Sequence, residues 1–287
     1  MHLRDWYDLT RLDHGILWGA AVVVGEILAY RGIPPLQYII LGFAAPLLVE
    51  IGVFSLNDYM DRESDILNNR IDRPLVRGAF PRQYPLYIAL VMLPGAVVVG
   101  FISSLMVPLI LVILFSALGV LYNVKLKGVP CVKNCIMGVC IAAPLLGGNL
   151  IVEDEILPVV ALFATAAFLL GTGREILKDM MDTAGDKATG CRTLPLLIGS
   201  KNSARIVFSL FLVSCVVILF PCGYPCDSFY FHDILYLISA CITCGLTVYC
   251  ACSLLKDWSR TRVVLLRKRT FNILELGVFT FLLGVLF

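Results

Sequence analysis

The chain has 287 residues, of which 59% are hydrophobic and 15% are charged, and its net charge is +2. A soluble domain is closer to half apolar and a quarter charged, so this composition excludes an ordinary soluble protein. Because the apolar residues form long runs, we expect a polytopic helical membrane protein whose residues 1–287 make a single domain. The segment Met1–Asp8 is acidic and aromatic and lacks the basic region of a cleavable signal peptide.

Nine apolar runs are long enough to be membrane-spanning helices. In chain order they cover about residues 14–30, 36–57, 84–102, 106–122, 132–152, 156–173, 204–221, 231–254 and 271–287. The predicted fold class is an all-α membrane protein with nine transmembrane helices.

Basic residues are concentrated in alternate connections between these spans. Of the 23 Lys and Arg residues, 22 lie on one side of the predicted bundle and only Arg31 lies on the other. Cytoplasmic loops carry such an excess, so we expect a multi-pass cell-membrane protein with its N-terminus inside and its C-terminus outside. Cys222 and Cys226 then lie on the outer side, where the sequence leaves a disulfide between them open.

Two matching aspartate-rich stretches follow the second and the sixth span. The first contains Asn57, Asp58, Asp61 and Asp65, and the second contains Asp179, Asp182 and Asp186. A constant offset of 121 positions relates the two stretches, and it continues downstream from Pro74-Leu75 to Pro195-Leu196 and from Gly78 to Gly199.

This offset predicts an internal duplication. The two four-helix repeats cover about residues 14–122 and 132–254, and the helix at about 271–287 is an addition. Four spans return the chain to its starting side, so both repeats run in the same direction. The two aspartate stretches are therefore expected to face each other across a central cavity on the cytoplasmic side.

The spacing of the aspartates predicts a metal site. Asp58, Asp61 and Asp65 stand at i, i+3 and i+7, which places them on one helix face. Converging carboxylates repel unless cations neutralise them, and oxygen ligands alone select Mg²⁺ first. Mg²⁺ completes its coordination with water and substrate phosphate, so we expect a pair of magnesium sites that hold one diphosphate carrying an apolar tail. Solvated helix ends are the alternative, which two motifs in the same register disfavour.

Three stretches resemble signatures of the UbiA superfamily of intramembrane prenyltransferases. The likeness lies in Asn57-Asp58-x-x-Asp61-x-x-x-Asp65 with Asp72-Arg73-Pro74-Leu75, in Tyr122-Asn123-Val124-Lys125-Leu126-Lys127, and in Arg174-Glu175-Ile176-Leu177-Lys178-Asp179-x-x-Asp182-x-x-Gly185-Asp186. The resemblance implies a nine-helix bundle around a central cavity and Mg²⁺-dependent transfer of a polyprenyl group from its diphosphate to an acceptor. It also implies two magnesium ions bridging the diphosphate, with ligands drawn from Asn57, Asp58, Asp61, Asp65, Asp179, Asp182 and Asp186.

Fixed cations near these motifs are candidates for stabilising the departing diphosphate. The candidate catalytic residues are Lys127, Tyr122 and Glu50, and the candidate diphosphate-binding residues are Arg73, Arg77, Lys125, Lys178 and Arg11. Positive-inside topology alone also explains any single one of these basic residues. Glu50 lies two turns deeper than Asp58, where it suits either an interhelical hydrogen bond or orientation and deprotonation of an acceptor. Arg11, at the start of the first span, also suits an acidic acceptor.

The acceptor is the open part of this prediction. An aromatic quinone precursor is the first choice, and ether-lipid transfer of the digeranylgeranylglyceryl phosphate synthase type is the alternative. A secondary transporter is the rival of another class, but transporters place their ionisable groups near the membrane midplane. The expected partners are a polyprenyl diphosphate such as the geranylgeranyl compound, a lipophilic acceptor and the lipid bilayer. We expect no nucleic acid and infer no obligate protein partner.

Overall fold

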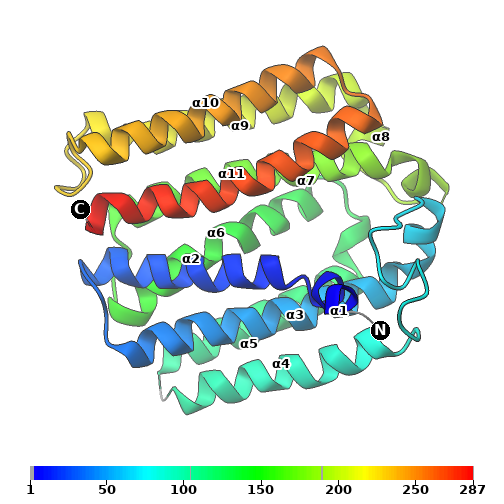
Figure 1. Ribbon diagram of the computed structural model, residues 1–287, viewed down its shortest axis with the longest axis horizontal. Helices are drawn as coiled ribbons and strands as arrows, with labels where there is room; N and C mark the ends of the chain where they lie inside the picture. Colours follow the sequence, from blue (N-terminus) through cyan, green and yellow to red (C-terminus); the bar gives the residue numbers. More distant parts are fainter. Residues whose placement is uncertain (1–2, 104, 189, 287) are drawn as a thin grey trace.

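The computed structural model describes residues 3–103, 105–188 and 190–286, and these fold into helices joined by short connections (Figure 1). The helices are α1 (Leu3–Thr10), α2 (Leu12–Tyr30), α3 (Leu36–Leu67), α4 (Tyr84–Ile102), α5 (Met106–Val124), the 3₁₀ turn η1 (Leu126–Gly128), α6 (Val132–Val152), α7 (Pro158–Ala188), α8 (Leu194–Ile198), α9 (Ser200–Gly223), α10 (Ile234–Lys256) and α11 (Arg260–Leu286).

Nine helices within the described residues are long and apolar enough to cross a membrane: α2 to α7 and α9 to α11. They lie side by side in one bundle, and the two ends of the chain lie toward opposite ends of it (Figure 1). The predicted fold class, a nine-helix membrane protein, is confirmed. The bundle end at which α3 and α7 finish and α11 begins is called the polar end below.

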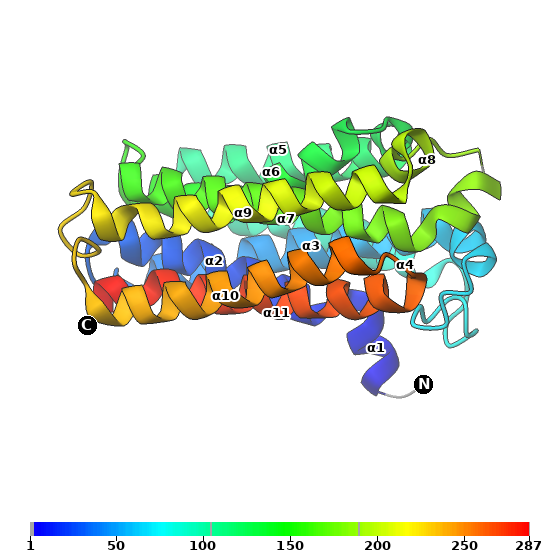
Figure 2. The same ribbon diagram turned by 90° about the horizontal axis from the view of Figure 1, so that it is seen from above.

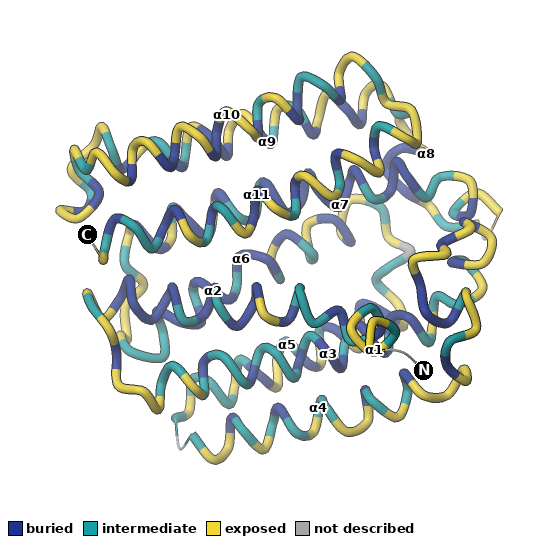
Figure 3. Tube along the Cα trace, in the orientation of Figure 1, coloured by how far each residue is buried: buried dark blue, intermediate teal, exposed yellow. Residues whose placement is uncertain are grey.

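Burial divides the helices into a central and a peripheral set. The apolar segments of α2 and α7 are the most buried, whereas those of α4 and α5 are the most exposed (Figure 3). Leucine, isoleucine and valine cover the outer faces, as expected where the surrounding medium is lipid rather than water. α1 projects away from the bundle near the polar end (Figure 2).

Two glycines allow α2 and α6 to pack closely. A Cβ atom on Gly25 would lie 2.3 Å from the backbone oxygen of Leu145, and one on Gly148 would lie 2.0 Å from that of Val22. Membrane helices without a hydrophobic driving force between them gain stability from such close contact between small residues. α2 is therefore held against α6, and the two helices together form a wall shared by both cavities described below.

Several helix boundaries differ from those expected. α3 continues to Leu67 rather than residue 57, and α7 continues to Ala188 rather than residue 173. The last helix begins at Arg260 rather than at residue 271, so the basic residues placed in a loop lie on α11 instead. Hydropathy marks only the apolar part of a helix, whereas Arg, Lys, Glu and Met are good helix formers that extend it into the polar region.

The sequence left open a disulfide between Cys222 and Cys226, and in the structure both are free thiols.

The α2–α6 contact is tested by substituting Gly148 with alanine. The added methyl group collides with the backbone of Val22, and overpacking of this kind costs about 1–3 kcal/mol. We expect a lower thermal unfolding midpoint for the purified protein in detergent. Gly245→Ala on α10 is the matched control, because its added Cβ meets no atom within 4 Å. Equal midpoints for the two variants would contradict the proposed packing.

Candidate functional site

The ends of α3 and α7 carry the two aspartate series and meet at the polar end. The Asn68 side-chain oxygen, just after α3, accepts a hydrogen bond of 2.8 Å from the backbone N–H of Gly185 on α7. The backbone oxygen of Asn68 accepts a second hydrogen bond, of 2.7 Å, from Arg260 at the start of α11. These contacts fix three helix ends relative to one another, so the two aspartate series cannot drift apart independently.

Cations from other segments pair with the α3 series. Arg11, in the left-handed turn between α1 and α2, contacts Asp58, which also accepts a 3.0 Å hydrogen bond from Arg73. Arg73 lies 3.7 Å from Asp65, and Lys127 in η1 contacts Asp61. Burying an unpaired carboxylate at this end of the bundle is costly, and these pairs offset that cost.

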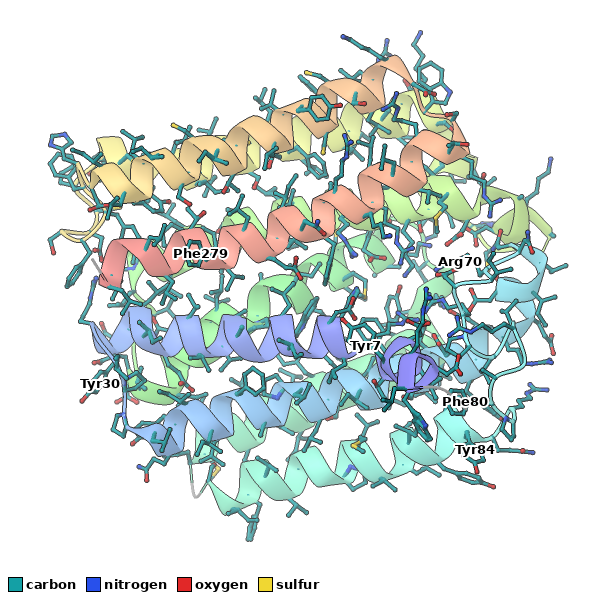
Figure 4. The ribbon with its side chains drawn as sticks, viewed as in Figure 1. Tyr7, Tyr30, Arg70, Phe80, Tyr84 and Phe279 are labelled. Carbon is teal, nitrogen blue, oxygen red and sulfur yellow. The ribbon has the colours of Figure 1, made fainter. Side chains whose placement is uncertain are left out.

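The α7 series has its own cations. Lys133, in the first turn of α6, lies 2.6 Å from Asp179, which also accepts a 2.8 Å hydrogen bond from Asn134. Arg70, in the connection after α3, lies 3.2 Å from Asp182. Arg70 therefore links the α3 connection to α7, and Figure 4 shows it at the polar end, far from Tyr30 at the opposite end.

The site residues outside the membrane spans have shifted pKa values. Burial would raise the pKa of Asp72, but hydrogen bonds and attraction from Arg70 outweigh it and hold that pKa below its usual value. Burial, reinforced by the positive charges of Lys178 and Lys133, lowers the pKa of Lys127 to about 7. Asp72 therefore stays ionised near neutral pH, whereas Lys127 changes its charge there.

Most of the residues that the sequence analysis assigned to the site are brought together. Asn57, Asp58, Asp61 and Asp65 lie with Arg11, Arg73 and Lys127, while Asp179, Asp182 and Asp186 lie on the facing part of α7 with Lys178. Lys178 pairs with Glu175 at 3.4 Å. Tyr122 is buried at the end of α5, within electrostatic range of Glu175 and Asp179.

Three assigned residues lie apart from this group. Arg77 pairs with Asp5 at 2.9 Å and Asp8 at 2.6 Å, so it holds α1 against the connection after α3. Lys125 is exposed at the end of α5. Glu50 lies about 12 Å below Asp58 along α3, at 1.5 Å per helical residue, in the wall of an apolar cavity.

Four residues of the site were not assigned to it from the sequence: Asn68, Arg70, Lys133 and Asn134. Each contacts a residue of α7 that lies more than 40 positions away in the sequence. Lys133 and Asn134 could have been recognised from the sequence, because a charged residue and an amide at the start of an apolar span are unusual. Both are buried in the structure. Asn68 and Arg70 lie in a connection that has no periodicity, so their contacts could not be deduced from spacing.

The donor atoms of the two series fit Mg²⁺. Asp58 Oδ2 and Asp182 Oδ1 are buried and have no hydrogen-bond partner among the described residues, so each series contains a buried carboxylate oxygen that is not hydrogen-bonded. Within the described residues, no three Asp, Glu, His or Cys side chains converge on one point as a protein-only metal site. Mg²⁺ usually binds through one or two carboxylates and takes its remaining ligands from water and substrate phosphates, which suits this arrangement.

A long apolar cavity begins beneath the aspartates. It has about 880 Å³ of empty space between α2, α3, α5 and α6, part of which is open to the surroundings. Its wall runs from Leu105, the residue just before α5, to Gly119 on α5, about 21 Å at ~1.5 Å per residue. Glu50 is the one charged side chain among the described residues that line it. The cavity therefore suits a long hydrocarbon chain whose charged end lies among the aspartates.

Comparison with known proteins agrees with this geometry. The profile of the UbiA prenyltransferase family matches residues 17–273. A digeranylgeranylglyceryl phosphate synthase of Archaeoglobus fulgidus is 34% identical over 283 residues, which cover 99% of this chain and 96% of that protein. The synthase of the same name from Thermococcus kodakarensis is 33% identical over 220 residues, covering 77% of this chain and 78% of the relative.

Solved structures share the fold. The apo structure of a UbiA homologue from Aeropyrum pernix K1 has a TM-score of 0.78 at 19% identity and covers 96% of this chain and 99% of its own. The structure of a UbiA homologue from Archaeoglobus fulgidus bound to GPP and Mg²⁺ has a TM-score of 0.63 at 14% identity and covers 97% and 99%.

A bundle with charged groups at one end and a long apolar cavity defines a class of membrane enzyme that acts on a charged head with a hydrocarbon tail. The family profile covers most of the chain, and a relative above 30% identity covers nearly all of it. The chain therefore belongs to the UbiA prenyltransferase family, and it is a multi-pass membrane prenyltransferase.

The link between α3 and α7 is tested with Asn68→Ala. The substitution removes the 2.8 Å hydrogen bond that the Asn68 side chain accepts from the backbone N–H of Gly185, and loss of one such bond costs about 0.5–1.5 kcal/mol. We expect prenyl transfer to fall at least about tenfold, because the two aspartate series lose their fixed separation. The measurement is initial rate with purified protein, alongside the thermal midpoint. Unchanged rates for Asn68→Ala would show that this contact does not position the site.

Proposed function

We propose that this protein transfers a geranylgeranyl group from its diphosphate to the free hydroxyl of a prenylated glycerol phosphate. This is the reaction type of a digeranylgeranylglyceryl phosphate synthase. The observation that carries the proposal is the pairing of two cation-balanced aspartate series with a long apolar cavity, in a chain that resembles synthases of that name over nearly its whole length. The same likeness favours the ether-lipid acceptor over the aromatic quinone precursor that was our first choice from sequence.

The length of the cavity supports the choice of donor. A chain of four isoprene units has 16 carbons in line and extends about 20 Å, at ~1.25 Å of advance per carbon–carbon bond. The wall of the cavity from Leu105, just before α5, to Gly119 extends about 21 Å, at ~1.5 Å per residue. A geranylgeranyl chain therefore fills the cavity when its diphosphate lies among the aspartates, and the apolar lining excludes water that would quench a developing carbocation.

We propose two magnesium ions at the aspartates, as in the donor complex implied by the family resemblance. A UbiA homologue of Archaeoglobus fulgidus is described as bound to GPP and Mg²⁺. The ligands are drawn from Asn57, Asp58, Asp61, Asp65, Asp179, Asp182 and Asp186. Bound magnesium supplies charge stabilisation to the leaving diphosphate.

The chain's own cations share that task. Lys127, Arg73 and Arg70 now neutralise aspartates, and they lie where they can turn toward phosphate oxygens when metal takes over the carboxylates. In the proposed reaction the acceptor oxygen bonds to carbon 1 of the prenyl chain, the bond from that carbon to the diphosphate oxygen breaks, and the hydroxyl proton passes to the departing diphosphate. Tyr122 lies at the junction of cavity and aspartates, and Glu50 remains a candidate for orienting the acceptor.

The proposed orientation places the polar end in the cytoplasm and the C-terminus outside, because the basic residues gather at the polar end.

The proposed duplication accounts for two features of the bundle together. α3 and α7, the second helices of the two proposed repeats, have nearly equal lengths of 32 and 31 residues, and both carry their aspartates toward the same end. The proposal needs no protein partner.

The aspartate assignment is tested with Asp61→Asn and Asp182→Asn. Each variant keeps the shape of the side chain and removes one negative charge from one series. We expect prenyl transfer and Mg²⁺-dependent binding of geranylgeranyl diphosphate each to fall at least about 100-fold, as for loss of one stabilising group in an enzyme site. Asp154→Asn, on an exposed connection at the opposite end, is the control and keeps both. Wild-type binding by Asp61→Asn and Asp182→Asn would refute the assignment.

The acceptor is tested by product analysis. Purified protein receives Mg²⁺, geranylgeranyl diphosphate and one acceptor at a time: geranylgeranylglyceryl phosphate, a quinone-precursor phenol, or no acceptor. We expect mass spectrometry to find the double ether from the glycerol phosphate and no prenylated phenol. A prenylated phenol as the main product would restore the aromatic alternative, and diphosphate binding without any product would point to a non-enzymatic role.

A further inference from the structure

A second group of cations lies at the polar end beside the aspartates. Arg174 on α7 and Arg267 on α11 lie within electrostatic range of each other and of Arg11. The Arg174 guanidinium lies 5.1 Å from the ring centroid of Phe271 on α11, and the ring of His14 on α2 stacks on the same phenylalanine at 4.3 Å. This group joins α2, α7 and α11, whereas Lys127 and Lys133 approach the aspartates from η1 and α6.

The positive charges of Arg174 and Arg267 are only partly neutralised by nearby carboxylates. Arg174 is 7% exposed, its one ion pair is a 4.0 Å contact with the adjacent Glu175, and its Nε atom is buried without a hydrogen-bond partner. Arg267 has a buried, unpartnered Nε atom too; Asp72 and Glu175 lie within its electrostatic range, but among the described residues neither forms an ion pair with it within 4.0 Å. Guanidinium groups that repel each other away from water are costly unless an anion joins them.

A second apolar cavity begins between one and two helical turns below these arginines. It has about 540 Å³ of empty space between α2, α6, α7, α9, α10 and α11, part of which is open to the surroundings. Leu170 lies one turn below Arg174 on α7, Leu17 and Trp18 lie one turn below His14 on α2, and Ile273 and Leu274 follow Phe271 on α11. A cationic head site above an apolar cavity has the polarity of an amphiphile with an anionic head.

The two cavities are adjacent. Trp18 and Pro144 line both of them, and each cavity has its own charged group at the polar end. A donor and an acceptor held in the two cavities would therefore bring their heads to the same end, with the aspartates on one side and the arginines on the other. Such placement brings the reacting groups together without forcing both tails into one cavity.

We propose that Arg174 and Arg267 bind the phosphate of the acceptor, and that the second cavity receives the part of its isoprenoid chain nearest the head. This inference rests on the proposed function, since it assigns the phosphate of the prenylated glycerol phosphate. The planar fork of arginine matches phosphate oxygens with two parallel hydrogen bonds, which lysine does not reproduce. Selection of a phosphate-bearing acceptor over a neutral one thus resides in α7 and α11 rather than in the aspartate series.

The test measures binding without turnover. Purified full-length protein in lipid nanodiscs receives radiolabelled geranylgeranylglyceryl phosphate with EDTA and no prenyl diphosphate, so the donor site does not contribute. We expect saturable binding by the wild type and about 10- to 100-fold weaker binding by Arg174→Gln and by Arg267→Gln, the loss expected for one hydrogen-bonded charge. Arg174→Lys and Arg267→Lys recover part of the affinity. Arg269→Gln is the matched control, because Arg269 is exposed on the same helix and its guanidinium bonds to the Tyr249 hydroxyl at 3.2 Å.

Two further readouts separate the possible outcomes. Mg²⁺-dependent binding of geranylgeranyl diphosphate stays within twofold of wild type in all variants, which also shows that they are folded. Competition by geranylgeranylglycerol, which lacks the phosphate, is weak and equal in wild type and variants. Unchanged binding of the phosphate lipid, or an equal loss of donor binding, overturns the inference. If arginine-dependent binding is seen but mass spectrometry finds prenyl transfer only to another phosphate-bearing acceptor, the proposed function fails and the phosphate site stands.

Discussion

Neutralisation of the carboxylates at the polar end is the constraint on which the rest of the structure depends. α3 and α7 carry Asp58 and Asp179 into a buried environment, where ionised groups are stable only beside cations. The cations come from segments far apart in the chain, among them Arg11 before α2, Arg73 after α3 and Lys133 on α6. These ion pairs therefore tie the connections to the helix ends, and in the proposed function the same groups bind the diphosphate.

The polarity of the bundle explains how one fold serves a charged head and a hydrocarbon tail. The helices are apolar along most of their length, so both cavities are lined almost wholly by hydrocarbon, whereas the charged pairs gather at one end. The close α2–α6 contact at Gly25 and Gly148 forms the partition between the cavities. In the proposed function this partition keeps two isoprenoid chains apart, while their heads meet above it.

The sequence predicted the features that arise from local periodicity. Apolar runs located all nine membrane helices, and the i, i+3, i+7 spacing correctly placed Asp58, Asp61 and Asp65 along one helix. The sequence could not predict contacts that depend on how the connections between helices fold back, such as Asn68 with Gly185 or Arg70 with Asp182. For the same reason Arg77 was assigned to the diphosphate although it pairs with α1. The start of α11 was misplaced because hydropathy does not distinguish a charged helical segment from a loop.

The central claim is that α3 and α7 together hold one diphosphate whose chain lies between α2, α3, α5 and α6. The most direct measurement is a crystal structure of the protein with Mn²⁺ and geranylgeranyl thiolodiphosphate, which resists cleavage of its carbon–sulfur bond. Our account predicts anomalous peaks beside Asp61 and Asp182 on either side of one diphosphate, with the isoprenoid chain along Leu105–Gly119. Metal bound elsewhere, or a chain directed away from that cavity, would contradict it.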